Sequence, residues 1–395
     1  MIDAPQIDRP WRACTAAGAP LEMHAPLHQL KLFDGAFITF HPEEPPTPPV
    51  VRDAAESLTA AAAGARETRG LDLAAGAVGA CAIAALVSKA APLPMAIFAG
   101  AALLLVTAVL RASGVLFLLA TAGVSAAVGA WVAGPPGQWS GSTDAALGAL
   151  GASATAAAAI AAGASVGLAA PAGVAAVLTC ATLTATGAIG AWLPGELAPA
   201  ALTVLGGVCL VAATPRLATR AAGLEIPRIP TAGEEFSSAD GYQADVDARS
   251  ERAIALAAAI SCAVAGCAIP ALVACAWGSG GWAFAFSLAA AGAFGLHTLR
   301  HHYPLPRLAL GAVTLAGIAG CVLAVVRTPG AHPAMVAFAA VAAACAAGTP
   351  LWLPRLPNLE PTTVVWFERA EAAAIIAVIP LAVQLTGVFA VIRGL

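Results

Sequence analysis

Three histidines that lie close together in the sequence are the first candidates for chemistry. His297 and His301 are four residues apart, a spacing that places two ring nitrogens on one face of a helix, and His302 is adjacent. Such a group could bind zinc or iron. However, no H-E-x-x-H motif and no neighbouring carboxylate accompany the histidines, which stand beside Arg300 at the end of an apolar segment. Polar side chains that reach from a membrane edge toward water explain the group without a metal, so we predict no metal site.

Other catalytic and cofactor-binding patterns are missing from the sequence. The lysines are Lys31 and Lys89, and neither follows a glycine as the lysine of a phosphate-binding loop does. There is no G-x-S-x-G motif, and no Ser, His and Asp group can be assembled at one depth of a membrane. The 9 cysteines form no C-x-x-C pair or zinc-binding spacing, and we interpret them as small apolar residues. We predict that the protein is not an enzyme and has no catalytic, cofactor-binding or metal-binding residues.

The composition indicates which elements must position any functional residue. Of the 395 residues, 59% are hydrophobic and only 10% are charged, whereas a typical soluble chain carries about 25% charged residues. Because this much apolar surface requires lipid as its solvent, we predict an all-α polytopic membrane protein. The net charge is −3, and no basic patch could follow a phosphate backbone, so we predict no nucleic-acid partner.

Apolar segments of about one membrane crossing each, roughly 20 residues, predict eleven transmembrane helices. Residues 1–70 precede them and form a polar, proline-rich cytosolic segment. Residues 71–213 contain six predicted spans, near 72–88, 93–110, 113–133, 145–163, 168–192 and 197–213. Residues 214–252 are charged and cannot lie in hydrocarbon, so they are predicted to form a cytosolic loop. Residues 253–395 contain the remaining spans, near 253–276, 281–299, 308–326, 333–352 and 370–392.

The distribution of basic residues predicts the orientation of these spans. If the N-terminus lies in the cytoplasm, only Lys89, Arg327 and Arg393 fall on the outer side, as the positive-inside rule requires. We therefore predict a plasma-membrane protein with a cytoplasmic N-terminus and an extracytoplasmic C-terminus. Every charge lies at or outside a predicted span end. This leaves no mid-membrane ionisable group of the kind that a pump or coupled transporter uses.

Two strands are predicted in the N-terminal segment. Residues Trp11 to Thr15 and Phe37 to Phe40 have strand character, and Asp34-Gly35 supplies a tight turn before the second strand. About 40 residues of this composition bury too little apolar area to fold alone. Three alternatives remain open: the segment docks on a partner, it is disordered, or its beginning was lost through a wrongly chosen start codon.

Three stretches of sequence carry a resemblance to a known family. Residues 215–236, directly after the sixth predicted span, read PRLATRAAGLEIPRIPTAGEEF. Residues 371–393 read EAAAIIAVIPLAVQLTGVFAVIR, with an acidic residue first, I-P-L in the middle and a closing arginine. Residues 30–58 read LKLFDGAFITFHPEEPPTPPVVRDAAESL. In this order they resemble the cytoplasmic loop, the last helix and the end of the ubiquitin-like domain of the EccD family, integral membrane proteins of the type VII (ESX) secretion system.

The resemblance implies both a fold and a role. The implied fold is eleven transmembrane helices that follow a cytosolic ubiquitin-like (β-grasp) domain, of which residues 10–42 would be a truncated part. The family is implied to be a non-catalytic structural subunit, a homodimer within each protomer of a hexameric assembly. Its neighbours there are membrane lipid and EccB-, EccC- and EccE-type subunits. The EccC-type subunit hydrolyses ATP, which agrees with the missing phosphate-binding loop in this sequence.

We therefore expect a scaffold of a type VII protein-secretion membrane complex that docks the cytosolic ATPase through residues 1–70 and 214–252. Separated basic and acidic clusters in the loop suit a polar interface, and the candidate contact residues are Arg216, Arg220, Glu234 and Glu235. Each of these charges is equally explained as part of a membrane-flanking anchor or a flexible linker. Two other functions stay open: a small-molecule permease or exporter, and a membrane enzyme acting on lipid through the 297–302 histidines.

Overall fold

The computed structural model describes residues 11–15, 21–22, 35–42, 71–134, 142–224, 245–278, 280–301, 303–352 and 361–394. Contacts between residues divide the chain into two compact units, Met1–Arg69 and Gly70–Leu395. Among the described elements, the strands belong to the first unit and the helices to the second. The two are therefore described separately.

The described residues of the first unit contain two antiparallel strands, β1 (Trp11–Thr15) and β2 (Ile38–Pro42). In their register Cys14 is paired with Thr39. The first strand is the one that the sequence predicts, whereas the second begins one residue later and ends two residues later than expected. Gly35 has φ 87°, a conformation that glycine adopts readily, just before the second strand. A ubiquitin-like fold for this segment stays a prediction.

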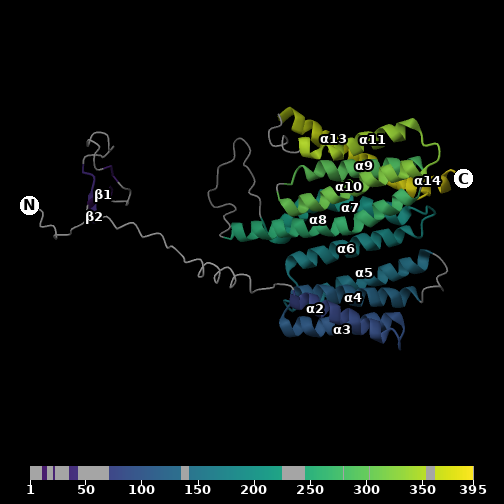
Figure 1. The fold of residues 1–395 in the computed structure, drawn as a ribbon, viewed down its shortest axis with the longest axis horizontal. Coiled ribbons are helices and arrows are strands. Elements are labelled where there is room, and N and C mark those ends of the chain that lie inside the picture. Colours follow the sequence, from purple (N-terminus) through teal and green to yellow (C-terminus); the bar gives the residue numbers. More distant parts are fainter. Residues whose placement is uncertain are drawn as a thin grey trace, which may run out of the picture. The chain divides into compact units, whose positions relative to one another are not determined.

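Helices make up the second unit, and one or two of them lie at each predicted span (Figure 1). The first six are α2 (Leu71–Val87), α3 (Leu93–Arg111), α4 (Gly114–Ala133), α5 (Ser142–Ser165), α6 (Pro171–Gly190) and α7 (Ala198–Ala222). Four long ones follow, namely α8 (Val246–Trp277), α9 (Gly281–Thr298), α10 (Pro304–Arg327) and α13 (Pro361–Leu385). The shorter ones are α11 (Pro333–Ala347), α12 (Thr349–Trp352) and α14 (Val388–Ile392).

The helix starts follow local rules that the sequence carries. Proline occupies the first turn of α3, α6, α7, α10 and α11, where its missing N–H is not needed and its fixed φ favours the helix. The hydroxyl of Ser113 accepts a hydrogen bond from the backbone of Leu116 and caps α4. Prolines and short polar turns thus divide the apolar sequence into separate helices.

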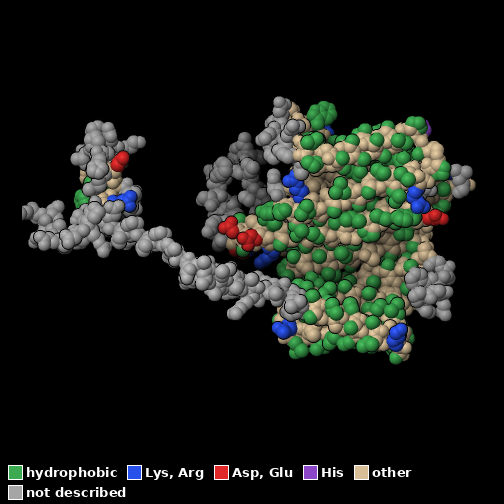
Figure 2. Space-filling model, in the orientation of Figure 1, with side chains coloured by type: hydrophobic (Ala, Val, Ile, Leu, Met, Phe, Trp, Pro, Cys, Tyr) green, Lys and Arg blue, Asp and Glu red, His purple; other side chains and the backbone are tan. Residues whose placement is uncertain are grey.

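Seven of the described helices are long and apolar enough to cross a membrane: α3 to α8 and α10. Helices α2 and α11 are apolar but shorter. Helix α9 has 18 residues with His297 in its last turn, and α13 carries Glu368, Arg369 and Glu371 within its length. On the face shown in Figure 2, charged side chains gather at the ends of the helices, and hydrophobic side chains cover the band between. The protein is therefore a mostly helical multi-pass membrane protein, and the predicted count of eleven spans stays a prediction.

The two largest hydrophobic clusters each join several helices. The larger contains fully buried residues of α6, α7, α8, α9, α10 and α13, among them Leu183, Val204, Leu272, Phe286, Leu310 and Val378. The smaller joins α2, α3, α4 and α5 around Leu116, Phe117 and Ile160. In lipid, helices associate through such close packing of side chains.

The turn between α6 and α7 is bonded to the last part of the chain. The backbone N–H of Gly195 donates to the carbonyl of Thr386, 2.9 Å away, where α13 ends and α14 follows. A Cβ on Gly195 would lie 2.1 Å from the carbonyl oxygen of Leu385, so only glycine fits there. Gly387, with φ 75°, allows the chain to break between the two helices. The single span predicted near 370–392 is thus two helices with a fixed bend.

The loop predicted at 214–252 is partly helical, which corrects its boundaries. Helix α7 continues to Ala222 and α8 begins at Val246. Pro215 lies inside α7 and does not end it. The segment that follows it, L-A-T-R-A-A, is rich in strong helix formers, and the Thr219 hydroxyl donates to the carbonyl of Pro215. Residues 225–244, which lie between these two helices in the sequence, are outside the described residues.

Candidate functional site

The first candidate site is the pair of helix ends formed by residues 214–224, at the end of α7, and 245–256, at the start of α8. We call it the outer end of α7–α8 because it lies away from the two largest hydrophobic clusters of the bundle. Arg216 and Arg220 are four residues apart on α7, so they share one face of the helix, and both are exposed. The structure therefore places two predicted contact residues together on a helix, where a loop was expected. Glu234 and Glu235, the other two, lie outside the described residues.

A set of local contacts fixes this outer end. Gly223 ends α7 in the left-handed conformation, φ 72°, and the N–H of Leu224 donates to the carbonyl of Thr219 at 3.0 Å. The guanidinium of Arg249, on α8, donates to the carbonyl of Gly223 and also pairs with Asp245 at 2.9 Å. Arg249 therefore joins the end of one helix to the start of the next.

Packing between the two helices reinforces these hydrogen bonds. Ala218 and Ala222 of α7 form a small buried cluster with Ala253 and Leu256 of α8. Because alanine side chains are short, the two helix backbones can approach closely at this point. Residues 214–222 and 246–252, at the two edges of the predicted loop, are thus packed helix ends.

The charges on this outer end are divided between the two helices. Exposed Arg216 and Arg220 lie on α7, whereas the start of α8 carries mainly acidic exposed side chains, Asp245, Asp247 and Glu251, together with Arg252. In Figure 1 α8 projects beyond its neighbours at this end, and acidic side chains gather at its tip in Figure 2. The hydrogen bond from Arg249 is the main cause that holds the pKa of Asp245 below its usual value. This surface can bind a charged partner, and it holds no grouping of nucleophile and base.

A second candidate site is a charged cluster inside the bundle, formed by His297, Arg300 and Glu371. His297 Nδ1 lies 2.7 Å from Glu371 Oε1, and Arg300 Nε lies 2.6 Å from Glu371 Oε2. The side chains of His297 and Glu371 are only 10% and 7% exposed, whereas that of Arg300 is 50% exposed. This corrects the expectation that no carboxylate accompanies the histidines and that they lie at a water-exposed edge.

Sequence reasoning missed this cluster because Glu371 stands 74 residues after His297. The one signal is an acidic residue at the start of an otherwise apolar segment, which in a membrane protein usually faces a partner inside the bundle. The ring of His301 packs edge-on against that of His297, with 5.3 Å between the ring centres, and His302 lies outside the described residues.

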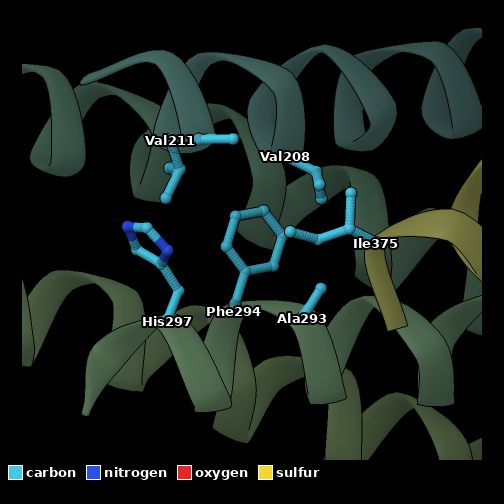
Figure 3. Close-up of a pocket in the computed structure, with 7 residues that line it drawn as sticks. Val208, Val211, Ala293, Phe294, His297 and Ile375 are labelled. Atoms are coloured by element: carbon cyan, nitrogen blue, oxygen red, sulfur yellow. The ribbon is translucent and has the colours of Figure 1, made fainter. Parts of the chain in front are cut away.

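A small pocket lies beside the cluster. Its walls come from α7, α9 and α13: Val208, Val211, Ala212, Ala293, Phe294, His297 and Ile375. Figure 3 shows the imidazole of His297 next to the ring of Phe294, with Val211 opposite. Apart from His297 the walls are apolar, so the pocket offers no set of polar groups that could orient a substrate.

The chemistry available to the cluster is that of an ion-paired network. Among the residues that the structure describes, no three His, Cys, Asp or Glu side chains are grouped so that they could hold a metal ion. Both oxygens of Glu371 have a partner within the protein, since Oε1 lies 2.7 Å from His297 Nδ1 and Oε2 accepts from Arg300 Nε. The cluster joins α9 to α13.

Comparisons with known proteins agree on one family. The family model described as an EccD-like transmembrane domain matches residues 68–395. A solved structure titled as protomer 1 of the ESX-3 core complex has a similar fold, with a TM-score of 0.58 and 19% sequence identity, over 98% of this chain and 92% of that one.

Another match is a MycP5-free ESX-5 inner membrane complex in state II, with a TM-score of 0.44 and 19% identity, over 88% of this chain and 86% of that one. No curated protein matches the sequence. Since the family model covers all the helices and most of the chain, the protein belongs to the EccD family of membrane proteins.

Proposed function

We infer that the protein is a non-catalytic structural subunit of a type VII (ESX) protein-secretion complex in the inner, or plasma, membrane. Membership of the EccD family supports this role, and the fold shared with a protomer of the ESX-3 core complex agrees with it. The subunit scaffolds the membrane assembly and docks its cytosolic ATPase.

The proposed neighbours follow from the same family. They are EccB-, EccC- and EccE-type subunits, membrane lipid, and a second copy of this chain within each protomer of a larger, hexameric assembly. The proposed orientation has the N-terminus in the cytoplasm and the C-terminus on the extracytoplasmic side. Residues 1–70 and the outer end of α7–α8 then lie on the cytoplasmic side and face the ATPase.

The outer end of α7–α8 is the observation that carries the docking proposal. A docking surface loses less conformational entropy on binding when it is already ordered. Here the helix ends are fixed by Arg249 and by the cluster around Ala222, and they present Arg216 and Arg220 side by side. Oppositely charged groups on the neighbouring helix give a surface that can orient a partner by charge.

Charge reversal tests the proposal directly. Arg216→Glu and Arg220→Glu are combined with Glu234→Lys and Glu235→Lys in a C-terminally tagged, chromosomally expressed copy. The expected result is that the protein reaches the membrane at normal levels but that co-purification of the ATPase in mild detergent falls at least about tenfold. The membrane subunits should still be recovered with it.

The matched control is Lys89→Glu, an exposed charge in the turn after α2. It should leave recovery of the ATPase unchanged. Unchanged recovery in the fourfold variant would contradict docking at this surface, and recovery of the wild-type chain without any partner would favour the permease.

A further inference from the structure

The charged cluster of His297, Arg300 and Glu371 lies where α13 enters the helix bundle. Helix α13 begins at Pro361, ten residues before Glu371, and ends at Leu385, fourteen residues after it. Beyond Glu371, α13 contributes Val378 and Ala382 to the main hydrophobic cluster, both fully buried. Before it, Val364, Val365 and Trp366 are exposed. Glu371 therefore marks the boundary between the packed inner part of α13 and its less packed outer part, residues 361–370.

The cluster is the polar contact that holds this boundary to the rest of the bundle. Glu371 Oε1 meets His297 on α9, and Oε2 meets Arg300 in the turn between α9 and α10. Two charge-assisted hydrogen bonds to different segments fix both the depth and the rotation of α13. A buried carboxylate without these partners would be strongly unfavourable, so the helix is held at the position where both contacts form.

Glu368, one turn before Glu371, provides an internal comparison. Its carboxylate is 3.9 Å from Arg300, and its side chain is 56% exposed. A pair at this distance and exposure contributes little to stability. Glu368 and Glu371 thus both contact Arg300. Only Glu371 is buried, so only its contact is expected to fix the position of α13.

The same contact lies close to the proposed docking surface. The pocket beside His297 is walled by Val208, Val211 and Ala212 of α7. Arg216 follows Val211 by five residues on α7, a rise of about 7.5 Å along the helix.

We propose that His297, Arg300 and Glu371 form a latch that holds the outer part of α13 against the bundle. With the latch closed, residues 361–370 continue the line of the packed helix. With Glu371 uncharged or removed, the outer part separates while the inner part stays packed through Val378 and Ala382. The latch is a conformational device beside the docking surface, and its existence does not depend on which partner docks there.

Amide hydrogen exchange of the full chain in lipid nanodiscs tests the latch. Glu371→Ala should raise exchange in peptides covering 361–371 at least about tenfold, because a broken buried pair opens the local structure. Exchange in peptides covering 372–385 should stay within about twofold of wild type. Glu368→Ala is the matched control and should change neither set of peptides.

Further variants keep the test decisive. Should Glu371→Ala not fold, the isosteric Glu371→Gln, which removes the charge and keeps the volume, gives the same comparison with the same expected direction. His297→Ala combined with Glu371→Ala should raise exchange no further than Glu371→Ala alone, since the two residues act on one contact. Equal effects of the Glu371 and Glu368 variants, or no rise at 361–371, would overturn the proposal. The proposal would also be overturned if the double variant His297→Ala and Glu371→Ala raised amide exchange at 361–371 well beyond the rise in Glu371→Ala alone.

Discussion

At the scale of single residues, the histidines show where sequence reasoning succeeds and where it stops. Their spacing and flanking arginines correctly placed His297 at the end of an apolar helix. The prediction that no carboxylate lies nearby was wrong, because helix packing brings Glu371 from a distant segment to 2.7 Å. A sequence read along one helix contains no information on which residue faces it from another helix.

Arg249 supports the first residue-scale prediction. Arg249→Ala removes the hydrogen bond to Gly223 and the ion pair with Asp245, so the outer end of α7–α8 should become less ordered. We expect faster amide exchange at 219–224 and 245–252 and unchanged exchange in α3 and α4. Arg252→Ala, on the same helix and also exposed, is the control and should have a smaller effect. Equal exchange in the two variants would contradict the joining role of Arg249.

The same ion pair predicts a pH dependence at this end. Arg249 lowers the pKa of Asp245, so the folded form binds the proton more weakly than the unfolded form. The contribution of the pair is therefore fully present above the ordinary Asp pKa of about 3.9 and is lost as the pH falls through the lowered value. Order at 245–252, followed by spectroscopy of a probe there, should stay constant between about pH 5 and 8. A change within that range would show that another group controls it.

At the scale of elements, hydropathy and proline positions predicted where helices lie, and they failed at helix ends. Every predicted span contains a helix, because apolar length and turn chemistry are properties of a local sequence. The continuation of α7 to Ala222 was missed because Pro215 and the arginines resemble a loop, whereas packing against α8 stabilises a helix there. Contacts between helices decide such boundaries.

The α4–α5 contact yields a prediction about an element pair. Gly129 and Gly148 approach each other so closely that a Cβ on Gly148 would lie 2.7 Å from the Gly129 carbonyl oxygen. Gly148→Val should therefore force the helices apart and destabilise the chain by about 1–3 kcal/mol, measured as a lower thermal midpoint in detergent. Gly266→Val, on α8, is the control, since a Cβ there meets nothing within 4 Å. Similar midpoints for the two variants would argue against close packing of α4 on α5.

At the scale of the whole molecule, the number of crossings and their orientation lead to a labelling prediction. Single cysteines are introduced at Ala90, Thr328, Arg216 and Glu251 in a chain whose own cysteines are replaced by alanine or serine. In intact cells an impermeant maleimide should label positions 90 and 328, which the predicted orientation places outside. Positions 216 and 251 should react only after the membrane is opened. Labelling of 216 in intact cells would reverse the orientation.

The fold as a whole was predictable to the extent that it depends on composition. A content of 59% hydrophobic residues indicates a membrane protein, and the amino-acid sequences of a few segments indicated the family whose model matches residues 68–395. What composition does not contain is which helices touch. The main cluster unites α6, α7, α8, α9, α10 and α13, and neither its members nor the buried Glu371 could be read from periodicity in helices that are apolar on all sides.

The hydrogen bond between Gly195 and Thr386 has a consequence for how the protein is made. The turn after α6 leaves the ribosome long before the end of α13 does, so its partner does not yet exist when the first six helices enter the membrane. Until the end of α13 has been made, the backbone N–H of Gly195 lacks the carbonyl of Thr386 as its partner. The bundle can close around residue 195 only after the segment that contains Thr386 has been synthesised.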